Sequence, residues 1–240
     1  DPAVDTTPTW SPDGTRVAFL SALTPLDGDI YTRAANGSGT LDTLLAGPLP
    51  EWGPNWSRNT RYLAYHVVDP ETKRDLWALP LTGDRKPFPV LQSQHEELLP
   101  VLSPDGRYVA YTSDESGRPE VYVIPFPSRD GSKWQVSVKG GQFPRWNGDG
   151  TELFYFEDTT MMAASVDIRS GFSVETPAPL FSVDRATLSV RTRPLSAAVP
   201  YDVTADSQRF VMVRPSVQAE DTTPRITVVE NWAKEFEKAP

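Results

Sequence analysis

The feature that most constrains this chain is a tandem repeat punctuated by the tetrapeptide Ser-Pro-Asp-Gly. The tetrapeptide occurs at residues 11–14 and again at 103–106, each time between two hydrophobic segments. Alignment on the preceding residue extends the pattern to five segments without gaps, with anchors at Trp10, Trp56, Leu102, Trp146 and Val203. The first four anchors follow one another at about 45 residues, a period typical of repeat architectures. The chain is therefore expected to fold as a series of similar units.

Each segment has the pattern of a tight turn that leads into a half-buried strand. Asp or Asn stands three residues after every anchor, and such a short side chain bonds the backbone N–H groups of a turn. The next position is mostly glycine, which tolerates positive φ. Two apolar columns follow at alternate positions, beginning at Val17 and Phe19, which is the periodicity of a strand. Asp13 and Asp105 are therefore predicted to be turn residues rather than ligand-binding residues.

Two further columns belong to the inner part of each unit. Proline stands two residues before four of the anchors, where we expect the entry of a strand rather than its middle. The tryptophan anchors are expected to pack between neighbouring units. The proline column consists of Pro8, Pro54, Pro100 and Pro144, and the tryptophan column consists of Trp10, Trp56 and Trp146.

The strand pattern of each unit predicts the fold class. Third strands are expected at 29–33, 75–81, 120–126, 161–166 and 225–232, and fourth strands at 40–45, 88–92, 133–138 and 179–183. This predicts an all-β fold, a β-propeller of about five four-stranded antiparallel blades. The predicted blades of this single domain are 1–48, 49–94, 95–140, 141–186 and 187–240. The fifth unit is degenerate, so the blades either close a ring of five through the N-terminal segment or belong to a ring of six or more, which we favour.

The composition excludes several classes of function. A net charge of −9 offers no basic face to phosphate groups, so nucleic acids and anionic membranes are not expected partners. The chain has no cysteine, which excludes disulfides and thiol catalysis, and no run of 18 apolar residues for membrane insertion. It begins at Asp1 rather than methionine, and we interpret it as a processed protein or a piece of a longer one.

Two segments resemble the repeat of TolB-type β-propellers: PTWSPDGTRVAFLS and PVLSPDGRYVAYTSDESG. Four stretches are similar to the propeller region C-terminal to bacterial serine/threonine protein kinases: DLWALPLTGDRKPFPVLQ, SPDGRYVAYTSDESGRPEVYVIPFP, KWQVSVKGGQFPRWNGDGTELFY and ITVVENW. That resemblance implies a periplasmic or extracytoplasmic location, and a parent chain with a kinase domain before a transmembrane helix. Kinase activity is not predicted for this chain, because it has no glycine-rich phosphate loop, HRD or DFG motif.

Groups suited to catalysis are few. The two histidines, His66 and His95, are far apart in the sequence, and no G-x-S-x-G elbow accompanies them. A metal centre usually draws on clustered histidines and carboxylates, which the sequence does not show. Glycosidase-type carboxylate pairs stay open, because carboxylates are abundant. We therefore predict no enzymatic activity, no cofactor and no catalytic metal.

One constellation indicates a binding site at a mouth of the central channel. The loops that join one blade to the next gather there, and three carboxylates stand five residues before an anchor. A cation or a basic peptide suits these carboxylates; the alternative is a solvated acidic rim that caps backbone N–H groups. The predicted ligand-binding residues are Asp5, Glu51, His95, Glu97, Gln142 and Arg145.

We predict a non-catalytic binding or scaffold module, the sensor or protein-interaction region of a larger bacterial receptor-like protein. A protein or a small ligand is the expected partner at the channel mouth, with upstream blades or a kinase domain in the parent chain. The alternatives are the substrate-gating propeller of a prolyl-oligopeptidase-like serine hydrolase and a TolB-like periplasmic adaptor. A propeller polysaccharide lyase is a further alternative, which requires a histidine and a metal in the channel.

Overall fold

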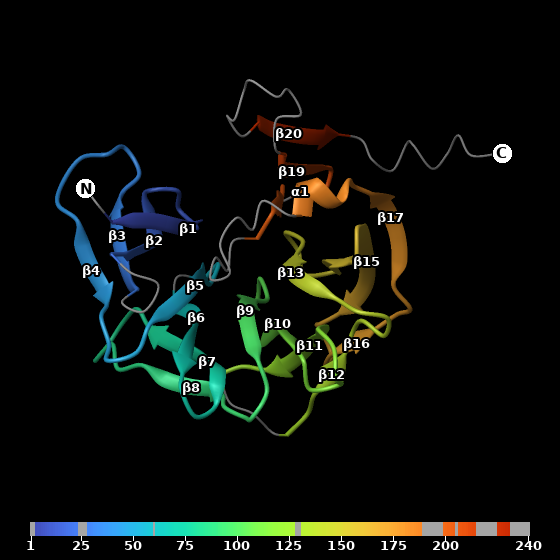
Figure 1. The fold of residues 1–240 in the computed structure, drawn as a ribbon, viewed down its shortest axis with the longest axis horizontal. Coiled ribbons are helices and arrows are strands. Elements are labelled where there is room, and N and C mark those ends of the chain that lie inside the picture. The colour runs from blue at the N-terminus through green and yellow to red at the C-terminus, as the bar shows by residue number, and fades with distance from the viewer. Residues whose placement is uncertain are drawn as a thin grey trace.

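The structure is a computed structural model that describes residues 3–23, 28–59, 61–127, 131–188, 199–204, 206–214 and 225–230. Within these residues the strands form five antiparallel sheets, which follow one another in chain order around a centre (Figure 1). The only helix in the described part of the chain is the single turn α1 (Arg185–Leu188). The predicted all-β fold of successive antiparallel sheets is therefore confirmed.

Each sheet is a meander whose first strand lies nearest the centre. The first sheet consists of β1 (Val4–Trp10), β2 (Arg16–Ala22), β3 (Asp29–Ala34) and β4 (Asp42–Leu45). The second consists of β5 (Glu51–Trp56), β6 (Tyr62–Asp69), β7 (Lys73–Pro80) and β8 (Phe88–Leu91). The third consists of β9 (Glu97–Leu102), β10 (Tyr108–Ser113), β11 (Glu120–Pro125) and β12 (Trp134–Gln135).

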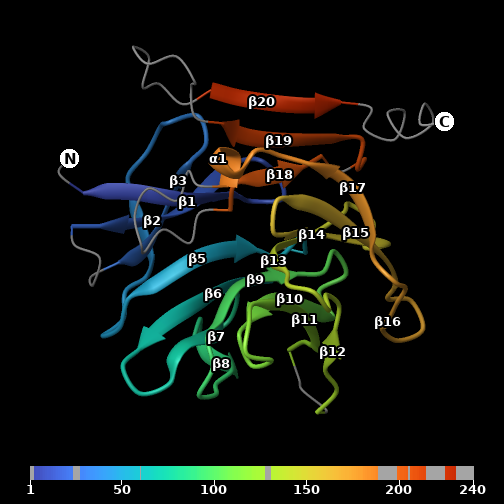
Figure 2. The ribbon, with the colours of Figure 1, turned by 45° about the vertical axis from the view of Figure 1, so that its right-hand side comes forward.

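The last two sheets depart from the four-stranded pattern. The fourth consists of β13 (Gln142–Trp146), β14 (Glu152–Glu157) and β15 (Thr160–Asp167), and β15 pairs with both β16 (Ser173–Val174) and β17 (Ala178–Ser182). The described part of the fifth consists of β18 (Tyr201–Val203), β19 (Arg209–Arg214) and β20 (Arg225–Glu230). Figure 2 shows the fifth sheet continuing the succession beside the fourth.

The Ser-Pro-Asp-Gly segment is the turn between the first two strands of a sheet. Asp13 Oδ1 accepts hydrogen bonds from Ser11 Oγ at 2.6 Å and from the Thr15 amide at 3.0 Å. These bonds, the one from Ser11 first, lower the pKa of Asp13 to about 2. In the third sheet Asp105 Oδ1 accepts the same pair of bonds from Ser103 Oγ and the Arg107 amide. The turn prediction is confirmed for both tetrapeptides.

Alternation along the strands gives every sheet two packing faces. The front face carries the two apolar columns of the repeat, for example Leu63 and Tyr65, and the back face carries the residues between them, for example Ala18. In the described residues, the front face of each sheet from the second to the fifth packs on the back face of the preceding sheet. The four core clusters therefore lie between the sheets, one at each junction.

The tryptophan anchors do not share one environment. Trp146 is buried between the third and fourth sheets, where its Nε1 donates to Val101 O at 3.0 Å, and Trp56 packs against the core between the first two sheets. Trp10 is 61 % exposed, so within the described residues this anchor does not pack between two sheets. The reason is that the described residues place no sheet over the front face of the first sheet.

None of the helical segments in the described ranges has the length and apolar character needed to cross a membrane.

Candidate functional site

A bulge repeated in the inner strands shapes the centre of the molecule. The pairing register shifts within β1, β5, β9 and β13, each time around the position before the proline of the repeat. That position has a positive φ in all four strands, at Thr7 (49°), Gly53 (63°), Leu99 (58°) and Phe143 (62°). A bulge bends its strand and turns the neighbouring side chains in new directions. The bulges therefore determine which residues face the central axis.

The bulge also corrects the expectation for the proline column. Pro8, Pro54, Pro100 and Pro144 lie inside their strands rather than at the strand entry. Proline lacks the N–H that a regular ladder requires, but a bulge leaves one residue out of the ladder. The proline is accommodated there, and the rings of Pro8, Pro54 and Pro100 become part of the wall of the channel.

The inner strands of all five sheets surround a central cavity of about 370 Å³. A second hollow of about 610 Å³ continues it toward the Ser-Pro-Asp-Gly turns and shares Pro8, Pro54, Asn55, Arg145 and Asp202 with it. The lining of the central cavity is Thr7, Pro8, Gly53, Pro54, Asn55, Leu99, Pro100, Arg145, Val199, Pro200, Tyr201, Asp202 and Val211. Its walls are mostly apolar, with a few polar groups between them.

Arg145 is the basic side chain that lines both hollows. Its side chain is 22 % exposed, and its Nη1 donates to Pro144 O at 3.1 Å. Its Nε lies 4.0 Å from Asp202 Oδ1, a carboxylate whose side chain is 80 % exposed. A guanidinium has five N–H donors in a planar fork. These contacts leave it able to bind an anionic group in the cavity.

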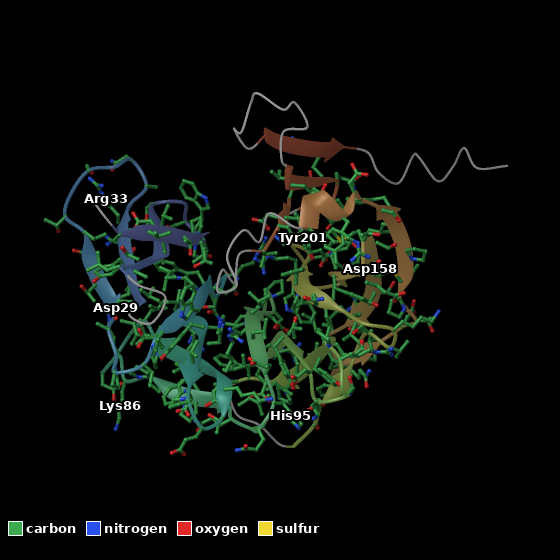
Figure 3. The ribbon with its side chains drawn as sticks, viewed as in Figure 1. Asp29, Arg33, Lys86, His95, Asp158 and Tyr201 are labelled. Atoms are coloured by element: carbon green, nitrogen blue, oxygen red, sulfur yellow. The ribbon has the colours of Figure 1, made fainter. Side chains whose placement is uncertain are left out.

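Hydrogen bonds between sheets hold the walls in place. Tyr201 OH donates to Phe143 O at 2.8 Å, and burial raises the pKa of that phenol above its ordinary value, so it stays a donor at neutral pH. Asn55 Oδ1 accepts from the Leu102 amide at 3.1 Å, which joins the second sheet to the third. Figure 3 shows Tyr201 on the side that faces the centre. The cavity is therefore largely preformed.

The structure places the predicted ligand-binding residues in several environments. Arg145 lines the cavity, but the other five are absent from the described residues that line it. Asp5 is exposed on β1 and Gln142 is half-buried on β13. His95 is exposed at the periphery, with Nδ1 3.8 Å from Asp114 Oδ1 (Figure 3). The six residues do not converge, and their role in binding stays a prediction.

The two remaining carboxylates, Glu51 and Glu97, are buried at the junctions between sheets. Burial, with a smaller contribution from the charge of Asp29, raises the pKa of Glu51 to about 8. Burial raises the pKa of Glu97 to about 7, although Ser93 Oγ donates a hydrogen bond to its Oε1. Glu51 is therefore mainly protonated at neutral pH. These acids belong to the packing of the sheets and not to a charged channel rim.

The described residues contain no group of three or more histidines, cysteines or carboxylates arranged to hold a metal ion. His66 is buried in β6, and burial lowers its pKa to about 3, so it is neutral. Neither histidine lies on the cavity.

Sequence reasoning missed most of the cavity lining. Thr7, Gly53 and Asn55 were not singled out, although they flank the proline column that was recognised. The available signal was a proline inside an apolar strand pattern, which is compatible with a bulge as well as with a strand entry. Gly53 beside Pro54 was a second signal, because an isolated glycine in a strand pattern indicates a bulge or a close backbone approach.

Comparison with known proteins supports the propeller architecture. No protein-family model matches the chain. The structure of TolB from Acinetobacter baumannii superposes with a TM-score of 0.71 at 17% identity, covering 97% of this chain and 53% of TolB. A puromycin-hydrolyzing peptidase from Mycobacterium tuberculosis superposes with a TM-score of 0.59 at 17% sequence identity, covering 95% of this chain and 36% of the peptidase. Oligogalacturonate lyase from Vibrio parahaemolyticus superposes with a TM-score of 0.59 at 12% sequence identity, covering 96% of this chain and 64% of the lyase.

This chain thus spans about half the length of the TolB structure that it matches. The similar structures include both enzymes and TolB, so they have a fold in common rather than an activity. The successive antiparallel sheets and these likenesses together show that the chain has a β-propeller fold.

Proposed function

We propose that this chain is a non-catalytic binding module whose ligand enters the central cavity and presents a carboxylate to Arg145. The observation that carries the proposal is the placement of this guanidinium on the wall of both hollows, with its weak contact to Asp202. A charge-assisted, bidentate contact with a carboxylate is the interaction for which arginine geometry is suited. The buried Glu51 and Glu97 offer no charged rim, which favours an anionic group over a cation or a basic peptide.

The walls of the cavity favour an extended segment of a protein partner. Proline rings from three inner strands form apolar surfaces in the central cavity. Apolar walls with a few placed polar groups are typical of binding pockets, and aromatic and arginine side chains are enriched at protein interfaces. The carboxylate belongs to an acidic side chain or to the C-terminus of the partner.

We further propose that the module is the extracytoplasmic or periplasmic sensor region of a larger bacterial receptor-like protein. This role is supported by the resemblance of the repeat to propellers attached to bacterial protein kinases. The proposal of a non-catalytic role is supported by the chemistry of the cavity lining. Among the described residues that line the cavity, Arg145 and Asp202 are the charged ones, and none is a histidine.

The test is peptide selection on the immobilised chain, followed by measurement of affinity for the variant Arg145→Leu. Random twelve-residue peptides serve as the probe, displayed with free C-termini. We expect enrichment of peptides with an acidic residue or an accessible terminal carboxylate, and a loss of about tenfold or more in affinity with Arg145→Leu, since a charged hydrogen bond is removed.

The matched control is Arg169→Leu, because Arg169 has a side chain that is 85 % exposed and lies away from the cavity. This variant should bind the selected peptides as the parent chain does. Circular dichroism and thermal unfolding establish that both variants are folded. Equal binding by the parent chain and Arg145→Leu, or selection without acidic groups, rejects the proposed recognition.

A further inference from the structure

The front face of the first sheet is an apolar surface that the described residues leave partly open. Trp10, Val17, Phe19 and Tyr31 share this face, because Trp10 pairs with Val17 and Phe19 pairs with Tyr31 across the ladder. Trp10 is 61 % exposed, and the other three are only half-buried. None of the four belongs to a core cluster of the described residues.

The repeat supplies an internal control for this observation. Tyr65 stands in the second sheet where Phe19 stands in the first, and it is only 2 % exposed. The same column is buried in the third, fourth and fifth sheets, at Tyr111, Tyr155 and Met212. Because sequence position and strand register are equivalent, the difference in burial has one cause. A preceding sheet covers the front face in four cases, and none of the described residues covers it in the first.

The four covered junctions indicate which side chains a sheet that covers the front face of the first sheet would carry. The back face of the fourth sheet carries aromatic rings such as Phe154, but the back faces of the first three sheets include small and branched aliphatic side chains. Examples on the first three sheets are Ala18 and Ile30, Ala64 and Leu76, and Ala110 and Val121. A bulky front face fits such a surface, because the aromatic rings fill the space above the small residues. Arg33 stands where Leu79 stands in the second sheet, so the outer part of the neighbour is expected to offer polar groups.

We propose that the front face of the first sheet is the docking surface for a further sheet of this repeat, carried by the same polypeptide outside residues 1–240. Three observations favour a sheet of the same polypeptide over a second copy of the chain.

First, all four junctions in the structure join sheets of one polypeptide, and a tethered sheet avoids the entropy loss of association. The sheets form an arc with an open side between the first and fifth sheets (Figure 1). The TolB structure, which shares the fold, is about twice as long as this chain.

A second copy related by twofold symmetry would fit the surface less well. Such a pair would place one bulky front face against another, whereas three of the four observed junctions set bulky front-face residues against small or branched aliphatic ones. The docking inference is independent of the ligand proposed for the central cavity.

The test uses a single introduced thiol, which the absence of cysteine in residues 1–240 makes possible. Phe19→Cys reports on the front face, and Leu23→Cys is the control, because Leu23 is an exposed residue beyond the end of β2. Maleimide labelling is measured in the 240-residue chain and in the polypeptide encoded by the complete gene. Val17→Cys repeats the measurement with a smaller change, in case the first variant does not fold.

We expect Phe19→Cys and Leu23→Cys to label at similar rates in the 240-residue chain. In the complete polypeptide, Phe19→Cys should label at least about tenfold more slowly, since a covered thiol reacts only when the covering sheet opens. Leu23→Cys should be unchanged. A benzophenone attached to the thiol at position 19 should then cross-link to a segment of the same polypeptide that has the alternating pattern of the repeat.

Three results overturn the inference. The first is equal labelling of Phe19→Cys in both proteins. The second is protection in the 240-residue chain that increases with protein concentration, which would identify a second copy as the occupant. The third is a cross-link to a different protein.

Discussion

Buried acids at the junctions show how a single residue makes stability depend on pH. Glu51 is buried at the junction of the first and second sheets, and its pKa is raised to about 8, chiefly by desolvation. In the unfolded chain the same group has an ordinary pKa of 4.5. Between these values the folded state binds more protons than the unfolded state. The stability that this group contributes is therefore complete below the unfolded pKa and is lost as the pH rises toward the folded pKa.

Replacement of Glu51 by Gln should reduce this pH dependence. The slope that a single such group adds is about 1.4 kcal/mol of unfolding free energy per pH unit. Urea unfolding of the parent chain from pH 5 to 7 should show falling stability, and Glu51→Gln should flatten the curve by about 1 kcal/mol per unit. The exposed Glu175→Gln is the control and should leave the slope unchanged. A slope equal in Glu51→Gln and the parent would show that Glu51 is ionised in the folded protein.

Within each inner strand, the bulge sets the shape of the cavity wall. The four positive-φ residues have little in common in sequence, since only one of them is glycine. A side chain in the left-handed region has an energetic disadvantage of roughly 1–2 kcal/mol relative to glycine. The sheets therefore maintain strained backbone at Thr7, Leu99 and Phe143 in order to face the prolines and Arg145 inward.

Gly53→Ala should lower the free energy of unfolding by about 1 kcal/mol, because alanine is strained at a φ of 63°. The reverse change, Thr7→Gly, should stabilise the chain by less, since glycine also raises the entropy of the unfolded state. Chemical denaturation of the two variants beside the parent measures both effects. A neutral result for Gly53→Ala together with destabilisation by Thr7→Gly would contradict a strained bulge at these positions.

At the scale of the whole molecule, stability comes from junctions between neighbouring sheets, as in other repeat architectures. Val17 and Val109 occupy the same column of the repeat, but Val109 is 1 % exposed and Val17 is half-buried on the open front face. Val109→Ala should lower the unfolding free energy of the 240-residue chain by about 2 kcal/mol through transfer and cavity effects.

Val17→Ala should lower the unfolding free energy by less than about 1 kcal/mol, because the half-buried Val17 side chain makes few contacts that alanine would lose. Thermal or urea unfolding measures the two variants under the same conditions, and the identical substitution makes each the control for the other. Equal losses would mean that a further part of the protein covers the front face of the first sheet in solution.

The repeat, the turns and the strand pattern can be predicted from the amino-acid sequence alone. These features depend on interactions between residues that are close in the chain. The bonds from Ser11 and Thr15 to Asp13, and the alternation that begins at Val17, need no distant partner. Repetition then made the propeller fold predictable, because each unit can bury its apolar columns only against another unit.

The residues that face the cavity, and those that are covered by another sheet, follow from the packing of the folded chain. The bulges reorient the inner strands, so Arg145 reaches the centre while Glu51 and Glu97, predicted beside it, are buried at the junctions. Trp10 and Trp146 have equivalent positions in the repeat, yet one is exposed and the other is buried. This is because a side chain is buried only when a second surface covers it, and a sequence motif specifies only the surface on which the side chain lies.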